Sequence, residues 1–237
     1  MSISRRSFTV FAAAMVVNRA FGSSGGMADV PANLDHILLG ANDLERGILW
    51  MQERSGVPAA VGGVHPGRGT RNALMSLGPR HYLEIIAPDP LQAGVSNELV
   101  DRLRSIQAPR LVGWAAHTND LTALAQKATS AGIPIETPRD GLRARPDGKT
   151  LRWKSFSLKQ DFSGVLPFFI EWSADSIHPS QDSPAGCTLQ HFFVNSPAWK
   201  DVSAAARELG LDFDIKAGKR PLLGARIAGK YGAFELT

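Results

Sequence analysis

The sequence contains one cysteine, Cys187, among its 237 residues, so no disulfide bond can form within the chain. It also lacks an apolar run of about 20 residues, the length that a membrane-spanning helix needs. Hydrophobic residues make up 43% of the chain and charged residues 20%, which is an ordinary globular composition. A chain of this length can bury one sizeable core or two smaller ones.

The chain has little net charge outside its first 28 residues. In total, 26 Lys and Arg residues stand against 22 Asp and Glu residues, a formal net charge of +4. Residues 1–28 contain Arg5, Arg6 and Arg19 and no acid, so the remainder has 23 basic and 22 acidic residues and a net charge of +1. A surface that binds nucleic acid needs a much denser basic patch, so we expect no nucleic-acid partner.

Residues 1–28 have the parts of an export signal: a basic start, an apolar stretch over residues 8–17, and small residues after it. The order SRRSF around Arg5 and Arg6 resembles the twin-arginine motif, although Thr9 and Val10 depart from its usual continuation. We predict that the twin-arginine export machinery carries the folded protein to the periplasm or the medium, with no membrane attachment after cleavage.

If the segment is a signal, cleavage could follow Gly22 or Ala28. Two alternatives to an export signal stay open, and the first is a disordered N-terminal tail. A translation start at Met27 would remove the signal and leave the protein in the cytoplasm.

The hydrophobic pattern of the body repeats. Residues 33–90 read as a strand, a capped helix and three more strands, and residues 110–175 repeat that order, with IPIETP as the expected second strand. Residues 186–237 give a shorter version: strand, helix and two strands. A β-α-β-β-β unit exposes one apolar sheet face and must pair with another unit to bury it. The sequence therefore predicts an α+β fold built from paired modules.

Three stretches carry a family resemblance: LDHILLGANDLERGILWM, VHPGRGTRNALMSLGPRHYLEIIAP and LVGWAAHTNDL. They resemble the vicinal oxygen chelate superfamily, most of all its glyoxalase-like domain branch; the superfamily includes glyoxalase I, extradiol dioxygenases and antibiotic-sequestering proteins. The resemblance implies a domain over residues 33–175, in which two βαβββ modules (33–90 and 110–175) form a cup-shaped curved sheet. A partial third βαββ module, residues 186–237, is expected to pack on it.

The resemblance also implies a metal site. Metal-using members take ligands from the first and last strands of each module, and these positions are His36, Glu84 and Glu171, with Gly113 at the fourth. Glycine has no side chain to coordinate, so one ligand is missing. One imidazole and two carboxylates suit a divalent metal such as Zn, Mn, Fe(II) or Ni. The alternatives are a hydrogen-bonded core histidine and glutamates that face solvent.

Further residues are candidates for contact with a small-molecule substrate. Glycines in residues 62–72 allow backbone groups to approach an anion, and nearby arginines can bind a carboxylate or phosphate. This loop lacks the lysine and spacing of a P-loop, so no nucleotide cofactor is expected. The alternative to an anion-binding loop is a solvated connection between two strands. The substrate-binding candidates are His65, Arg68, Arg71, Asn72, Trp114, His117 and Trp153. His117 could also replace the missing ligand, while His191 and Glu235 are weaker candidates.

These residues lead to competing functional hypotheses. The first is an exported, divalent-metal-dependent lyase, isomerase or dioxygenase acting on a small carbonyl, carboxylate or phenolic compound, with Glu171 moving the proton. A dioxygenase would need His117 or His191 to join the site. The alternative is a non-catalytic binding protein of the bleomycin-resistance type, which Gly113 favours. The third module either completes a sheet or contacts a second chain, so a homodimer stays open.

Overall fold

The computed structural model describes residues 30–144 and 148–237. The predicted export signal over residues 1–28 lies outside the described residues and stays a prediction.

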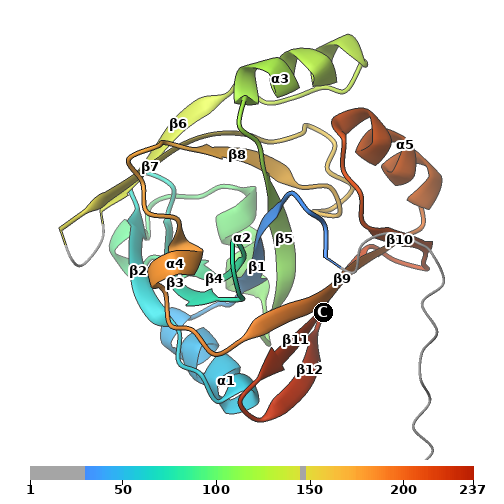
Figure 1. Ribbon diagram of the computed structural model, residues 1–237. Helices are drawn as coiled ribbons and strands as arrows, with labels where there is room; N and C mark the ends of the chain where they lie inside the picture. Colours follow the sequence, from blue (N-terminus) through green and yellow to red (C-terminus); the bar gives the residue numbers. More distant parts are fainter. Residues whose placement is uncertain (1–29, 145–147) are drawn as a thin grey trace, which may run out of the picture.

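Strands dominate the described part of the chain (Figure 1). The strands are β1 (Leu34–Gly40), β2 (Ala60–His65), β3 (Thr70–Ser76), β4 (Tyr82–Pro88), β5 (Arg110–His117), β6 (Arg139–Ala144), β7 (Thr150–Phe156), β8 (Phe168–Trp172), β9 (Thr188–Ser196), β10 (Asp214–Ala217), β11 (Leu222–Gly229) and β12 (Gly232–Leu236). The helices are α1 (Leu44–Ser55), α2 (Glu98–Ser105), α3 (Leu121–Ser130), α4 (Pro179–Asp182) and α5 (Trp199–Leu209), with a short 3-10 helix, η1 (Pro90–Gln92).

The two predicted modules form one curved, eight-stranded sheet with the order β2-β3-β4-β1-β5-β8-β7-β6. Each module places its strands in the same order, because β1 pairs in parallel with β4 and β5 pairs in parallel with β8. The modules meet where β1 and β5 run antiparallel. The predicted α+β fold with paired βαβββ modules is therefore confirmed.

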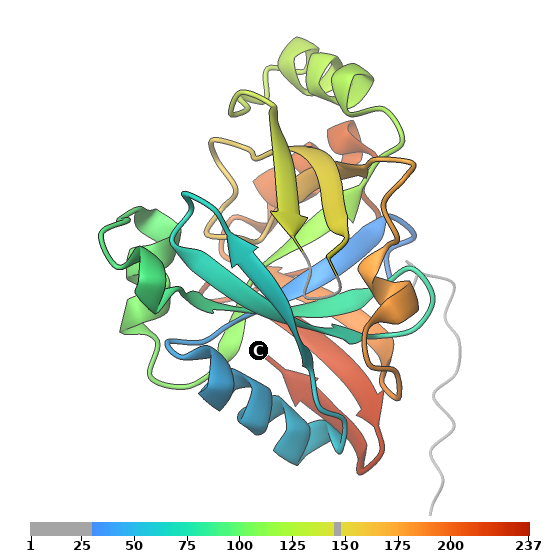
Figure 2. The same cartoon turned by 90° about the vertical axis from the view of Figure 1, so that its left-hand side faces the viewer.

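The two edge strands of this sheet, β2 and β6, approach each other and nearly close it into a barrel. A Cβ atom at Gly62 would overlap the side chains of Arg143 and Asn72, and one at Gly63 would contact the carbonyl oxygen of Ala144. Glycine is required for this close approach. Figure 2 shows the β6–β7 hairpin reaching down towards β2 and β3. The predicted cup is thus a nearly closed half-barrel with an enclosed concave face.

The C-terminal strands form a second sheet, ordered β10-β9-β11-β12, which packs on the convex side of the first. Trp114 of β5 contacts the rings of Phe192 and Phe213 at centroid distances of 5.0 and 5.1 Å. The expected strand, helix and two strands are present, but β10 is added between α5 and β11. The first strand of this segment, β9, lies between β10 and β11 and not at an edge. The segment therefore does not repeat the strand order of the two modules.

Helices α1 and α3 begin at side-chain caps. Asp43 accepts a hydrogen bond from the backbone of Arg46, and Asp120 accepts one from the backbone of Ala123, which satisfies amide groups that the first helical turn leaves free. Gly56 ends α1 in the left-handed region, with φ at 72°. Within residues 30–144 and 148–237, none of the helices is long and apolar enough to cross a membrane.

Two local predictions need correction. The stretch IPIETP forms only an isolated bridge between Ile135 and Leu158, and the edge strand of module two is instead β6. The prolines of IPIETP cannot donate ladder hydrogen bonds, whereas β6 carries charged residues that hide its strand character. Helix α2 was not expected; its residue Leu103, with Ile106 just after the helix, packs on the concave face and closes one end of the half-barrel.

Candidate active site

A β-bulge in β1 brings two adjacent polar side chains together. Opposite β5, Leu34 pairs with Ala116 and His36 pairs with Ala115, so Asp35 is an extra residue in the ladder. A bulge re-aims side chains that would otherwise alternate between the faces of the sheet. As a result, Asp35 Oδ1 lies 2.6 Å from Nδ1 of His36 in the buried interior.

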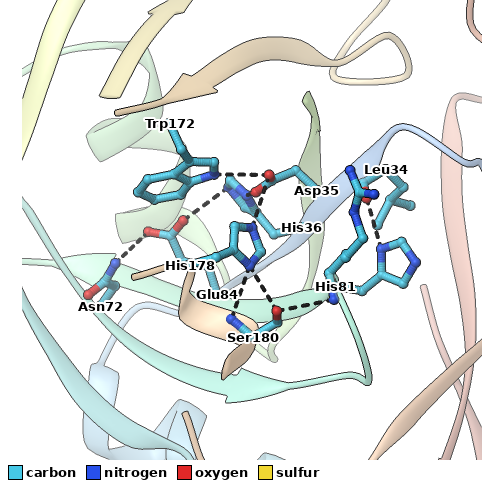
Figure 3. Close-up of polar contacts among 10 residues, drawn as sticks. Leu34, Asp35, His36, Asn72, His81, Glu84, Trp172, His178 and Ser180 are labelled. Atoms are coloured by element: carbon cyan, nitrogen blue, oxygen red, sulfur yellow. Dashed lines mark hydrogen bonds and ion pairs between the residues drawn. The ribbon is translucent and has the colours of Figure 1, made fainter. Parts of the chain in front are cut away.

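The second nitrogen of His36 faces Glu84 on the neighbouring strand β4. His36 Nε2 lies 3.4 Å from Glu84 Oε2, and this nitrogen is buried without a hydrogen-bond partner among the described residues. The Tyr82 ring stacks on the imidazole at a centroid distance of 4.4 Å, and Phe168 contacts its edge. Figure 3 shows His36 between the two carboxylates. We refer to His36 and Glu84 as the central pair.

The central pair is an ion pair at neutral pH. Burial disfavours the charged form of His36, but the hydrogen bond with Asp35 and the negative charges of Asp35 and Glu84 outweigh it and raise its pKa to about 9. Burial likewise opposes ionisation of Glu84, yet His36, His65 and Asn72 lower its pKa to about 2. The pKa of Asp35 falls well below its ordinary value, despite burial, because of His178 and His36.

Glu84 is held by a second set of polar side chains from β2 and β3. Asn72 Nδ2 donates to Glu84 Oε1 at 2.8 Å, while His65 Nε2 lies 3.7 Å from the same oxygen. Arg143 from β6 donates to Asn72 Oδ1 at 2.6 Å. Burial, above all, lowers the pKa of His65, so this imidazole is neutral beside the ion pair. Module two thus contacts the central pair directly through the Phe168 ring and indirectly through Arg143, which binds Asn72.

Asp35 also contacts two residues far along the chain. Its Oδ2 accepts a hydrogen bond from Trp172 Nε1 at 3.0 Å and lies 3.2 Å from His178 Nε2 (Figure 3). His178 Nδ1 hydrogen-bonds in turn with the hydroxyl of Ser180 at 2.8 Å. Sequence reasoning missed Asp35, His178 and Trp172. Strict alternation along β1 sends Asp35 to the opposite face, and no local pattern reveals a bulge.

Glu171 does not join the central pair, so the expectation of three ligands at one centre needs correction. Strand alternation places Glu171 on the convex face of β8 with Phe169, which belongs to the main core. Its Oε2 accepts a hydrogen bond from the backbone of Leu121 at 2.6 Å, at the start of α3. Its carboxylate therefore caps a helix, which satisfies a half-buried acid without a metal.

Several predicted substrate-binding residues lie elsewhere. Trp114 is fully buried on the convex side, where its Nε1 donates to the carbonyl oxygen of Val165. Arg71 is held at the surface by both carboxylate oxygens of Glu45, at 3.0 and 2.7 Å. His117 hydrogen-bonds with the guanidinium of Arg80 and does not replace the missing ligand at Gly113.

The remaining candidates lie around the concave face or far from it. Trp153 packs against Trp172, with ring centroids 5.6 Å apart, and so contributes to the aromatic wall. Arg68 lies in the β2–β3 turn and interacts electrostatically with Glu84. His191 lies in the C-terminal sheet, 3.7 Å from Asp214, and Glu235 is exposed there on β12.

The central pair offers part of the donor set of the metal site that the family resemblance implies. His36 Nε2 is an unpartnered buried nitrogen facing a carboxylate, which supplies two donors. In the part of the chain that the structure describes, however, no three His, Cys, Asp or Glu side chains are placed to hold a metal ion. Module two offers Gly113 and the cationic Arg143 instead of ligands. These residues do not fit a centre with three or more protein ligands, the usual minimum for a catalytic zinc.

Comparisons with known proteins agree with this architecture. The family model described as "Glyoxalase-like domain" matches residues 34–210. A hypothetical protein from Staphylococcus aureus has a similar structure, with 16% identity, a TM-score of 0.61, and coverage of 80% of this chain and 87% of that one. A methylmalonyl-CoA epimerase from Mycobacterium tuberculosis shares 20% identity over 65% of this chain and 94% of its own, with a TM-score of 0.46.

No curated protein matches the sequence. The family model covers most of the chain, and the paired modules provide the fold that such a domain requires. The chain therefore belongs to the glyoxalase-like domain family.

Proposed function

We propose that the protein is an enzyme that moves a proton on a small carbonyl or carboxylate compound, with His36 and Glu84 as its acid and base. One observation carries this proposal: a buried imidazole nitrogen without a hydrogen-bond partner lies 3.4 Å from a buried carboxylate. Buried polar atoms that make no hydrogen bond are rare and costly, so such an atom marks a place for a ligand.

His36 supplies the acid. Because its pKa is raised to about 9, the imidazole is protonated at neutral pH and Nε2 can donate a hydrogen bond. A substrate carbonyl oxygen at this nitrogen would meet a fixed positive charge where negative charge develops during enolisation. Preorganised charge of this kind is the largest source of rate enhancement in many enzymes.

Glu84 supplies the base. One of its oxygens takes the proton from the carbon next to the carbonyl group, and the electrons of the C–H bond move to the carbonyl oxygen that His36 stabilises. Return of the proton to carbon completes an isomerisation, and loss of a neighbouring leaving group completes a lyase reaction. Glu84 is a weak base while it faces the His36 cation, and its basicity rises as the substrate oxygen takes over that contact.

The surroundings of the central pair would orient the substrate and exclude water. Asp35 fixes the His36 ring, Asn72 fixes the carboxylate of Glu84, and the rings of Tyr82 and Phe168 cover the imidazole. His36 is only 2% and Glu84 only 7% exposed, so a ligand enters only when a lining side chain moves. A dry site strengthens every charge interaction within it.

Proton exchange tests this proposal without a known substrate. The protein is incubated in deuterated water with a panel of 2-hydroxy acids, 2-oxo acids and acyl thioesters, and NMR follows the replacement of the proton beside the carbonyl carbon. We expect catalysed exchange with at least one compound, lost in both His36→Gln and Glu84→Gln and retained in the control Glu171→Gln. Exchange that survives both substitutions would refute the assignment.

A second candidate function is binding without turnover. The aromatic side chains of Tyr82, Phe168, Trp153 and Trp172 favour it, since such walls can hold a flat apolar molecule. The same panel separates the two functions. A compound that binds tightly to the wild-type protein, yet shows no catalysed exchange, would support sequestration.

Metal-dependent chemistry and export remain predictions from the sequence. The central pair supplies only two of the donors that a resident metal ion needs. Export through the twin-arginine machinery rests on residues 1–28 and is compatible with a chain that has one cysteine and no disulfide.

A further inference from the structure

Three arginines lie on or beside the two strands that nearly close the half-barrel, β2 and β6. Arg68 lies in the turn between β2 and β3, whereas Arg139 and Arg143 lie on β6. Side chains two and four residues apart on a strand share a face, so Arg139 lies on the same concave face as Arg143, which contacts Asn72 in the interior. The two modules thus contribute positive charge to one seam.

Arg68 and Arg139 act on each other as like charges. Burial and the positive charge of Arg139 lower the pKa of the Arg68 guanidinium, while Glu84 acts in the opposite direction. The Arg68 guanidinium is therefore within electrostatic range of both Arg139 and Glu84 of the central pair. Placing like charges together costs free energy unless an anion binds between them.

Neither guanidinium forms a hydrogen bond or ion pair with another residue within the described ranges 30–144 and 148–237. Other arginines of the chain do have such partners: Arg71 binds Glu45 through two hydrogen bonds, and Arg104 lies 3.3 Å from Asp101. Arg71 is only three residues from Arg68 and so provides a matched comparison. The guanidinium groups of Arg68 and Arg139 therefore have N–H donors available for a ligand, whereas those of Arg71 are used by Glu45.

The turn that carries Arg68 is held in place by its neighbours. Gln92 accepts a hydrogen bond from the backbone of Gly67 at 2.7 Å, and Asn97 donates to the carbonyl oxygen of Arg68 at 3.2 Å. Arg139 begins a paired strand, opposite Ser155 of β7. Both side chains therefore extend from fixed backbone, which lowers the entropy cost of ordering them around a ligand.

We propose that Arg68 and Arg139 form an oxyanion clamp that binds a carboxylate or phosphate group of the substrate at the seam between the two modules. This inference rests on the proposed function and adds its substrate class: a compound with an anionic group at one end and the reacting carbonyl group at the other. Guanidinium groups bind both kinds of oxyanion with charge-assisted, bidentate hydrogen bonds. Arg143, on the same face of β6 as Arg139, is linked to the central pair through Asn72.

Calorimetric titration of the whole protein with succinate and with inorganic phosphate tests the clamp. We expect at least one probe to bind, and Arg68→Gln and Arg139→Gln each to weaken binding on the order of tenfold, the loss expected for one charge-assisted hydrogen bond. Arg71→Gln is the matched control and should change the dissociation constant by less than about twofold, as is usual for an exposed ion pair. Stronger binding of succinate identifies a carboxylate, and stronger binding of phosphate identifies a phosphate.

The clamp is refuted if neither probe binds the wild-type protein, or if Arg71→Gln weakens binding as much as Arg68→Gln. The experiment also distinguishes a wrong assignment of the clamp from a wrong assignment of His36 and Glu84 as acid and base. With an exchanged compound in hand, the clamp variants should raise KM and leave kcat nearly unchanged, whereas Glu84→Gln should abolish exchange and leave probe binding intact. An uncharged ester of that compound should lose the same affinity as the double clamp variant.

Discussion

The carboxylate of Asp35 lies between two imidazoles, with Oδ1 2.6 Å from His36 Nδ1 and Oδ2 3.2 Å from His178 Nε2. Asp35 is almost completely buried, so its charge acts across a medium that screens it poorly. It orients the His36 ring and favours its protonated form. A carboxylate in this position plays the part that it plays behind many catalytic histidines.

The stability of the wild-type protein should reach a maximum near pH 6.5. The pKa of His36 is raised from 6.5 to about 9, so its contribution is fully present below pH 6.5 and is lost as the pH rises to about 9. The pKa of Glu84 is lowered from 4.5 to about 2, so its contribution is lost as the pH falls through that interval. Urea unfolding at a series of pH values measures this profile.

The other histidines with shifted pKa values do not oppose the alkaline decline. The pKa values of His65, His81 and His117 are lowered, chiefly by burial, so these groups affect stability only below pH 6.5. Asp35→Asn should flatten the decline between pH 6.5 and 9, because the His36 pKa loses its main support. A wild-type stability that stays constant or rises over this interval would contradict the ion pair.

Glu171 should matter for stability and not for chemistry. Removal of the carboxylate in Glu171→Ala deprives the Leu121 amide at the start of α3 of its acceptor, which should cost about 1 kcal/mol, as for other helix caps. Chemical denaturation measures this loss, and Asp120→Ala at the same helix start is a control of similar size. A loss of proton exchange in folded Glu171→Ala would return this residue to the active site.

Two glycines on the half-barrel should respond in opposite ways to alanine. A Cβ atom at Gly62 would overlap Arg143 and Asn72, so Gly62→Ala should cost roughly 1–3 kcal/mol and weaken ligand binding. A Cβ atom at Gly113 meets nothing within 4 Å, so Gly113→Ala should leave stability and binding nearly unchanged. Thermal unfolding and the calorimetric assay check both variants. Equal effects would argue against a tight seam between β2 and β6.

Removal of metal ions should leave proton exchange intact. His36 and Glu84 supply two donors and module two supplies none, which is too few to retain a resident catalytic ion. Dialysis against EDTA followed by elemental analysis and the exchange assay tests this expectation. If exchange is lost and a divalent ion restores it, the enzyme is metal-dependent and His36 and Glu84 are the first ligands to examine.

The twin arginines should control export. Replacement of Arg5 and Arg6 by lysine keeps the charge of the signal but removes the guanidinium pair of the motif. In a bacterial host with a twin-arginine pathway, we expect the wild-type protein in the periplasm and the double variant in the cytoplasm. Cell fractionation with immunodetection measures the distribution, and equal export of both proteins would contradict the predicted route.

The sequence was sufficient to predict the repeated modules, because two strand-to-helix junctions with capping aspartates, Asp43 and Asp120, recur at a fixed spacing. The family resemblance implied that His36 and Glu84 lie near each other, because it assigns both residues to ligand positions, and the structure places them 3.4 Å apart. The same reasoning failed for Glu171. Strand periodicity states which residues share a face, but the face that becomes concave is decided by packing of the whole sheet.

The groups around the central pair could not be predicted for different reasons. Asp35 joins it through a bulge, which has no sequence signature, and His178 comes from a loop whose path depends on distant contacts. Arg143 and Arg139 lie on an edge strand that lacks apolar alternation, so the stretch reads as a solvated loop. These interactions are long-range, whereas pattern analysis sees only neighbours along the chain.

The internal symmetry of the half-barrel is not matched by a symmetry of roles. All the side chains proposed to act on the reacting carbon come from the first module, while the second supplies guanidinium groups and the indole rings of Trp153 and Trp172. Two duplicated modules with different roles can accumulate substitutions independently of each other. Substitutions in the second half could therefore redirect the choice of compound while the proton-transfer machinery stays untouched, which makes that half the natural target for altering selectivity.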